Sequence, residues 1–177
     1  PPKNILIVYM ILFTLFNALS IIAPDYNTLL MSRFLAGLPH GAFFGVGTIV
    51  AIKLSKKGKE AQAVSSMFTG LTLAILLLVP LLTYIGHNTS YKWAFLIVSL
   101  LGIFTILALI KFMPKLKSLK TVTFKEEIEF FLTFKAWHII LIVAIGFGGL
   151  FAWFSYIAPL LINVSKFSPS SISYLML

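Results

Sequence analysis

The stretch "RFLAGLPHGAFFGVG", residues 33–47, decides how this sequence is interpreted. It contains one arginine, one histidine, one proline and four glycines, while leucine, isoleucine, phenylalanine, valine and methionine dominate on both sides. A permanent charge in so apolar a segment is costly unless it faces a partner or water. The stretch therefore indicates a helix with a specific task, lining a moving cavity.

The overall composition indicates a membrane protein. Of the 177 residues, 59% are hydrophobic and 11% are charged, whereas a soluble domain has about 45–50% apolar and 25% charged residues. The chain has no cysteine, which excludes disulfides, thiolate zinc sites and cysteine nucleophiles within these residues.

Several segments have the length of a transmembrane helix, about 20 apolar residues. The fold class predicted from them is all-α, a polytopic transmembrane helical bundle. A sixth apolar segment begins near residue 170, so the sequence is interpreted as a piece of a longer protein. The five complete segments are residues 4–23, 27–52, 61–86, 91–112 and 137–163.

The lysines define a predicted sidedness. With the N-terminus inside, eleven lysines lie at inner ends and loops and two lie outside, which is the bias of the positive-inside rule. This explains the net charge of +9 without nucleic acid and indicates attraction to the inner leaflet. We predict a multi-pass protein of the cell (inner or plasma) membrane with residues 54–59 and 113–135 cytoplasmic. The inner lysines are Lys3, Lys53, Lys56, Lys57, Lys59, Lys111, Lys115, Lys117, Lys120, Lys125 and Lys135; the outer ones are Lys92 and Lys166.

Three parts of the chain follow from this pattern. Residues 1–112 form four transmembrane helices, 113–136 a cytoplasmic linker, and 137–177 one helix and the start of another. Within the linker, one predicted helical face carries Phe124, Ile128, Phe131 and Leu132. We expect an amphipathic helix on the inner membrane surface; the alternative is an extension of the next span.

Small residues recur in the opening stretch at intervals of four. Gly37, Gly41 and Gly45 form one stripe on a helix, and such stripes let transmembrane backbones approach closely. We expect this helix-packing motif to contact another helix. Because small-residue stripes are common in apolar helices, ordinary packing is the alternative to a cavity-lining role.

The polar residues of the stretch are the candidate site. His40 lies two turns beyond Arg33 and shares its helical face, while Pro39 removes a backbone hydrogen bond and should bend the helix. For Arg33 the alternatives are snorkelling to the outer headgroups or a place in a polar cavity. For His40 they are a proton-carrying imidazole or a packed ring bonded to a carbonyl.

These residues carry a resemblance to a known family. The segment "SRFLAGLPHGAFFGVGTIVA" resembles the fourth transmembrane helix of major facilitator superfamily transporters, and Arg33, Gly37 and Gly41 match that superfamily's arginine motif. The sequence of this segment is similar to that of the drug:proton antiporter branch, in particular to the bacterial sugar-efflux and arabinose-inducible exporters. Residues 68–103 and 146–175 resemble helices five to six and seven to eight. The chain thus looks like helices three to seven, and the start of eight, of a twelve-helix fold.

The resemblance implies secondary active transport by alternating access, in which two six-helix halves rock around a central site. It implies proton-coupled efflux of a small molecule, drug-like or sugar-like, with Arg33 and, by our addition, His40 in transport and coupling. The partners implied are the substrate, protons, the lipid bilayer and the missing helices, with no nucleic acid, no cofactor and no metal. In helix five, Pro80 matches the family's proline and is expected to bend the helix, but Val79 stands where the family has a glycine. This difference bears on the direction of transport and on proton coupling.

The predicted helix seven carries a second group of candidates. After the flexible "GFGG" at residues 146–149 come Phe151, Trp153, Ser155 and Tyr156, which we interpret as a substrate cavity. The alternative is that these aromatic side chains face lipid or pack against neighbouring helices.

The sequence leaves two alternatives to a transporter. An intramembrane enzyme needs a nucleophile and a base, or metal ligands, at one depth, and His40, His87 and His138 lie at three depths. The spans contain no acidic residue, so we predict that the protein is not an enzyme. The other alternative is a truncated or decayed transporter fragment without transport activity of its own.

Overall fold

The computed structural model describes residues 1–117, 124–168 and 171–175 and divides the chain into two compact units, Pro1–Leu119 and Lys120–Leu175. Every regular element in these described ranges is helical. Unit 1 contains α1 (Pro2–Ile21), α2 (Tyr26–Leu54), α3 (Glu60–Asn88) and α4 (Tyr91–Phe112); unit 2 contains α5 (Phe124–Phe131), α6 (Phe134–Asn163) and α7 (Ile172–Leu175).

The five long helices confirm the all-α transmembrane prediction. Each of α1, α2, α3, α4 and α6 is long and apolar enough to cross a membrane. Their ends differ by a few residues from those predicted. In particular, α6 begins at Phe134, three residues before the predicted span, and the division of the chain into two halves and a linker stays a prediction. Of the predicted sixth segment, the structure describes the short helix α7.

The helix ends have local causes. Asp25 caps α2, because its Oδ1 accepts a hydrogen bond from the Thr28 amide at 2.8 Å. The hydrogen bonds from Thr28 lower the pKa of the exposed Asp25 carboxyl, so the cap is fully charged near neutral pH. Between α2 and α3 the chain turns at Gly58, whose φ of 81° favours glycine.

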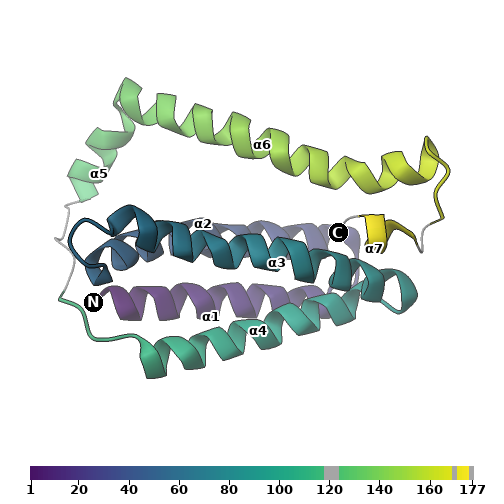
Figure 1. Cartoon of the computed structure of the whole chain (residues 1–177), viewed down its shortest axis with the longest axis horizontal. Helices are drawn as coiled ribbons and strands as arrows, with labels where there is room; N and C mark the ends of the chain where they lie inside the picture. Colours follow the sequence, from purple (N-terminus) through teal and green to yellow (C-terminus); the bar gives the residue numbers. More distant parts are fainter. Residues whose placement is uncertain (118–123, 169–170, 176–177) are drawn as a thin grey trace. The chain divides into compact units, whose positions relative to one another are not determined.

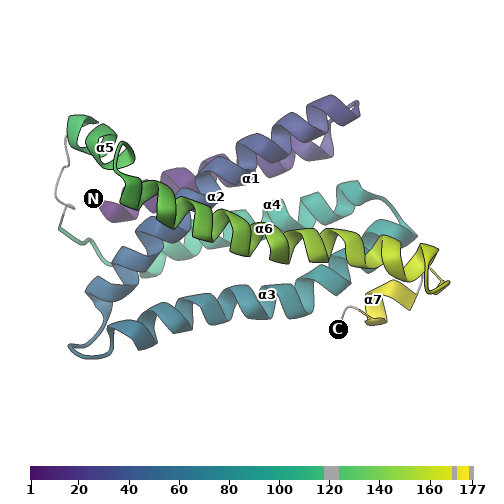
Figure 2. The ribbon, with the colours of Figure 1, turned by 90° about the horizontal axis from the view of Figure 1, so that it is seen from above.

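In unit 1, α1 is the central helix. It packs against α2 on one side and α4 on the other, while α3 contacts α2 and α4 (Figure 1). Figure 2 shows the same helices from above. The buried side of α1 changes character along its length, from apolar near its start to polar near its end. Its members are Pro2, Leu6, Met10, Thr14, Asn17 and Ser20.

The helices α1 and α4 pack tightly at Gly102. A Cβ atom added at Gly102 would collide with Thr14 Oγ1 and lie 3.2 Å from Thr14 Cβ. Thr14 Oγ1 is buried and accepts no N–H or O–H hydrogen bond within the described residues.

Lys3 joins the first and fourth helices at one end of unit 1. Its Nζ donates to the backbone oxygens of Ile110 at 2.8 Å and Met113 at 2.7 Å, at the carboxyl end of α4. Those carbonyls lack partners within a helix, and a cation there is favoured by the helix dipole. The start of α1 and the end of α4 therefore lie together.

Unit 2 is built on one long helix. The Thr133 hydroxyl accepts a hydrogen bond from the Ala136 amide at 3.3 Å and so caps α6. The helix α5 includes residues of the predicted amphipathic segment, and Ile128, Phe131 and the following Leu132 are exposed. The side chain of Phe124 lies outside the described residues. Placement of this segment on the membrane surface stays a prediction.

Candidate functional site

The candidate site is built around Arg33, the sole arginine of the chain. Its guanidinium donates three hydrogen bonds to α1: Nε to Ser20 Oγ at 3.0 Å, Nη1 to Asn17 Oδ1 at 3.0 Å, and Nη2 to the Phe16 carbonyl at 3.3 Å. Arg33 is itself half-buried. The guanidinium is therefore held against α1 and is not extended along its own helix toward the headgroups.

The two serines beside Arg33, Ser20 and Ser32, make more hydrogen-bond contacts than their two hydroxyl protons can serve. Ser20 Oγ and Ser32 Oγ lie 2.7 Å apart, and they also face the carbonyls of Phe16 at 3.1 Å and Leu29 at 2.7 Å. Two hydroxyl protons thus serve three contacts, since each hydroxyl donates once. In either arrangement Ser20 Oγ can still accept from Arg33, so the guanidinium keeps its partner.

The charge of Arg33 is compensated without a carboxylate. Its Cζ lies 4.4 Å from the ring centroid of Phe95 in α4, a cation–π contact. Its hydrogen-bond acceptors are neutral, and none of the residues that the structure describes pairs with it as an anion. Neutral dipoles and an aromatic ring therefore stabilise the charge inside a membrane span, an arrangement that leaves it open to an anionic ligand.

His40 lies in an aromatic series that connects three helices. Its ring centroid is 5.7 Å from that of Phe13 in α1 and 5.1 Å from that of Phe44, which stacks on Phe68 of α3 at 5.8 Å. Within residues 1–117 and the described part of unit 2, His40 makes ring contacts and no hydrogen bond, and both of its predicted roles stay predictions. Like Arg33, it contacts α1.

The glycine stripe of α2 faces open space. A Cβ atom added at Gly37, Gly41 or Gly45 would meet no atom within 4 Å in the described residues. Gly47 is the one glycine of this helix whose added Cβ would contact a neighbour, at 3.3 Å from Met67 Sδ. The packing role of the stripe stays a prediction that requires helices outside this chain.

Gly41→Leu tests that prediction. The variant is expected to leave unit 1 folded, because the added side chain enters open space, and to reduce transport if another helix of the whole protein contacts the stripe. The measurements are substrate flux and the yield of folded protein by size-exclusion chromatography. Normal flux would show that the stripe faces lipid.

The predicted kinks lie inside continuous helices. Pro39 is buried within α2, between Arg33 and the glycine at position 41, and Pro80 lies within α3. Each leaves a carbonyl of the preceding turn without its helical partner. The bends expected at these prolines remain predictions.

The candidate cavity residues of α6 do not share one face. The helix runs without a break from Phe134 to Asn163, and each residue turns it by about 100°. Phe151 and Ser155 therefore lie on one side, where Ser155 Oγ donates to the Phe151 carbonyl at 2.8 Å, and Trp153 and Tyr156 lie on nearly the opposite side. On a regular helix the two pairs would line different sides of a cavity, and the cavity role of the four residues stays a prediction.

Sequence reasoning missed the partners of Arg33. Asn17 and Ser20 in α1 and Phe95 in α4 lay outside the predicted site. A signal was present in the first helix, because Thr14, Asn17 and Ser20 recur every three residues within an apolar span. Polar side chains at membrane depth generally face a bundle interior, so their face could have been anticipated.

Comparisons with known proteins agree with this architecture. The family model of the Major Facilitator Superfamily matches residues 1–177. The inner membrane transport protein YdhP of Escherichia coli is 38% identical over 167 residues, which are 94% of this chain and 43% of YdhP. AraJ of Escherichia coli, described as a transporter, is 34% identical over 175 residues, 99% of this chain and 44% of AraJ. The MFS-type transporter YtbD of Bacillus subtilis is 30% identical over 176 residues, 99% of this chain and 44% of YtbD. The chain thus spans less than half the length of these relatives.

Proposed function

Because the chain belongs to the Major Facilitator Superfamily, a family of membrane transporters, we propose that the whole protein is a secondary active transporter of a small molecule. We propose further that it exports a drug-like or sugar-like substrate in exchange for protons, by alternating access. The relatives include an inner membrane transport protein, which supports a place in the inner membrane. The substrate site would require helices beyond those in this chain, since the chain spans about 44% of AraJ.

One observation carries the proposed coupling. A guanidinium lies in a membrane-spanning helix, and among the residues that the structure describes its partners are neutral hydrogen-bond acceptors and an aromatic ring. A charge without a counter-ion in a span is costly and is generally functional. An anionic substrate group or a deprotonated carboxylate of another helix could pair with it in one state of the cycle, and His40, two turns away, could carry the exchanged proton.

The test is flux in vesicles that contain the whole protein. An imposed proton gradient, acidic on the side to which substrate is exported, is expected to accelerate transport, because exchange with protons releases the energy of the gradient. Collapse of the gradient with a protonophore should return the flux to its downhill rate. Flux that does not change with the proton gradient would contradict proton coupling. Flux driven by a sodium gradient would indicate sodium coupling instead.

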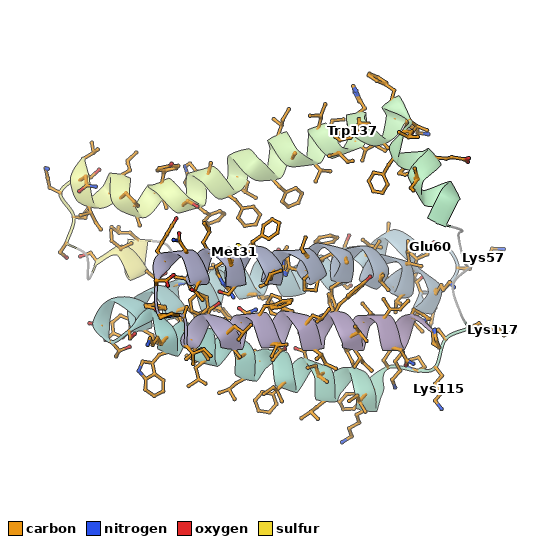
Figure 3. The ribbon with its side chains drawn as sticks, turned by 180° about the vertical axis from the view of Figure 1, so that it is seen from behind. Met31, Lys57, Glu60, Lys115, Lys117 and Trp137 are labelled. Carbon is orange, nitrogen blue, oxygen red and sulfur yellow. The ribbon has the colours of Figure 1, made fainter. Side chains whose placement is uncertain are left out.

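The proposed topology has its own test. Lys57, Lys115 and Lys117 lie at one end of unit 1, and Met31 lies toward the other (Figure 3). Cysteines placed at Ser55, before α3, and at Asn88, at its end, should therefore label from opposite faces with an impermeant thiol reagent. Position 55 should react only in inverted vesicles. Labelling of both positions from the outside would overturn the cytoplasmic assignment of residues 54–59.

A further inference from the structure

The environment of Arg33 depends on one fully buried amide. Asn17 is 1% exposed near the end of α1, and both the oxygen and the nitrogen of its side-chain amide form hydrogen bonds. Its Nδ2 donates to the Phe13 carbonyl at 2.7 Å, and its Oδ1 accepts from Arg33 Nη1 at 3.0 Å. No other side chain contacts both a backbone carbonyl of α1 and a terminal nitrogen of the guanidinium within the described residues.

The orientation of that amide follows from its partners. The Phe13 carbonyl can only accept, so the NH₂ group must face it, and the amide oxygen must then face Arg33. Asn17 cannot rotate its amide without placing NH₂ against the guanidinium, where two donors would oppose each other. The backbone of α1 thereby fixes which atom Arg33 meets.

Asn17 differs in this respect from Ser20. The Ser20 hydroxyl can turn its proton toward the Phe16 carbonyl or toward Ser32, because Ser20 Oγ faces both groups. Asn17 has a single arrangement that satisfies its partners. Both groups accept from Arg33, but only the amide is held in one orientation by the backbone of α1, so the acceptor that meets Nη1 is fixed.

We propose that Asn17 is the positioning residue of Arg33: it holds the guanidinium against α1 in the direction from which Arg33 meets its mobile partner during transport. The expected effect on transport rests on the proposed function, whereas the hydrogen bond between Asn17 and Arg33 is independent of it. Asn17 touches neither substrate nor proton. Its effect passes through Arg33 alone.

Asn17→Leu removes the interaction and Asn17→Asp keeps an acceptor at the same place. Leucine is close in size to asparagine and is favoured in a membrane span, so insertion of α1 should not suffer. The matched control is Ser99→Ala, because Ser99 is 5% exposed in α4 and its Oγ donates to its own helix at the Phe95 carbonyl, 2.8 Å away. All three variants alter a buried polar group, but only two of them alter the contact with Arg33.

The first readout requires no transport. In the whole protein labelled with ¹⁵N-arginine, the side-chain resonance lost in Arg33→Lys identifies Arg33. Its N–H exchange with solvent should accelerate roughly tenfold or more in Asn17→Leu, the factor expected when a hydrogen bond to a charged group is lost. Exchange should stay near the wild-type rate in Asn17→Asp and Ser99→Ala. Equal exchange in Asn17→Leu and Ser99→Ala would overturn the proposal.

The second readout separates positioning from plain stability. The pH at which flux is half-maximal should shift in Asn17→Leu, which removes the acceptor, and also in Asn17→Asp, whose carboxylate would give Arg33 a counter-ion, while Ser99→Ala leaves the pH profile unchanged. A uniform loss of flux with an unchanged profile in all variants would assign Asn17 a structural role and overturn the proposal. If the wild-type protein itself shows no flux, the proposed function fails, and the exchange measurement still decides the role of Asn17.

Discussion

Replacing Gly102 by alanine or leucine is expected to leave little folded protein. The new Cβ would collide with Thr14 Oγ1 and lie 3.2 Å and 3.3 Å from Thr14 Cβ and Cγ2, at a tight contact between α1 and α4. Overpacking of this kind costs about 1–3 kcal/mol, and more where a backbone must move. Leucine should be worse than alanine, since its side chain would force the two helices apart. The measurements are the yield of monodisperse protein and its thermal unfolding in detergent.

The chain supplies both a control and a rescue for this experiment. Gly70→Leu places the same side chain in α3, where an added Cβ meets nothing within 4 Å, and should retain a wild-type yield. Thr14→Ala removes Oγ1 and Cγ2, so the pair Thr14→Ala with Gly102→Ala should recover much of the protein that Gly102→Ala loses. Equal losses in Gly70→Leu and Gly102→Leu, or no rescue by the pair, would contradict the assigned contact.

Arg33→Lys is expected to fail almost as severely as Arg33→Ala. Arg33 reaches Ser20, Asn17 and the Phe16 carbonyl through three different nitrogens at 3.0–3.3 Å. A lysine has a single nitrogen at the end of a flexible methylene chain and cannot reproduce the planar guanidinium. Each hydrogen bond to a charged group contributes about 1.5–3 kcal/mol, so loss of one should reduce flux by roughly tenfold or more. The measurement is substrate flux in vesicles, with and without an imposed pH gradient.

Arg33→Gln distinguishes coupling from anchoring. Glutamine can replace part of the hydrogen bonding but carries no charge, so gradient-dependent flux should be lost even where folded protein is recovered. Undiminished, gradient-dependent flux in Arg33→Gln would remove Arg33 from the coupling mechanism. Circular dichroism and size-exclusion profiles of each variant show whether a lost flux reflects a lost fold.

The helices of this chain could be predicted because each depends on its own composition. Segments of about 20 apolar residues must be helical in lipid, where every backbone group needs an internal partner. The predicted ends were less accurate, since caps such as Asp25 and Thr133 depend on individual hydrogen bonds. The α6 start at Phe134 illustrates this: a cap hydroxyl begins the helix before its apolar pattern does.

Contacts between helices could not be predicted in the same way. The glycine stripe at positions 37, 41 and 45 fits a packing motif, yet the described residues leave it open, whereas Gly102 has no motif and forms the close contact. Similarly, the charge at Arg33 was visible in the sequence, but its acceptors are on another helix. A helical period shows which residues share a face and not which helix that face meets.

The polar half of α1 also fixes an order of events during synthesis. Asn17 precedes Arg33 by 16 residues, which a ribosome adds in about 1–3 s at roughly 5–20 residues per second. Phe95 and Gly102 follow Asn17 by on the order of 80 residues, or about 4–16 s at the same speed. The hydrogen-bond acceptors of α1 thus enter the bilayer before Arg33, and Phe95, whose ring contacts the guanidinium, enters last. A permuted gene that encodes α2 ahead of α1 would reverse this sequence and expose the guanidinium to lipid before any acceptor exists.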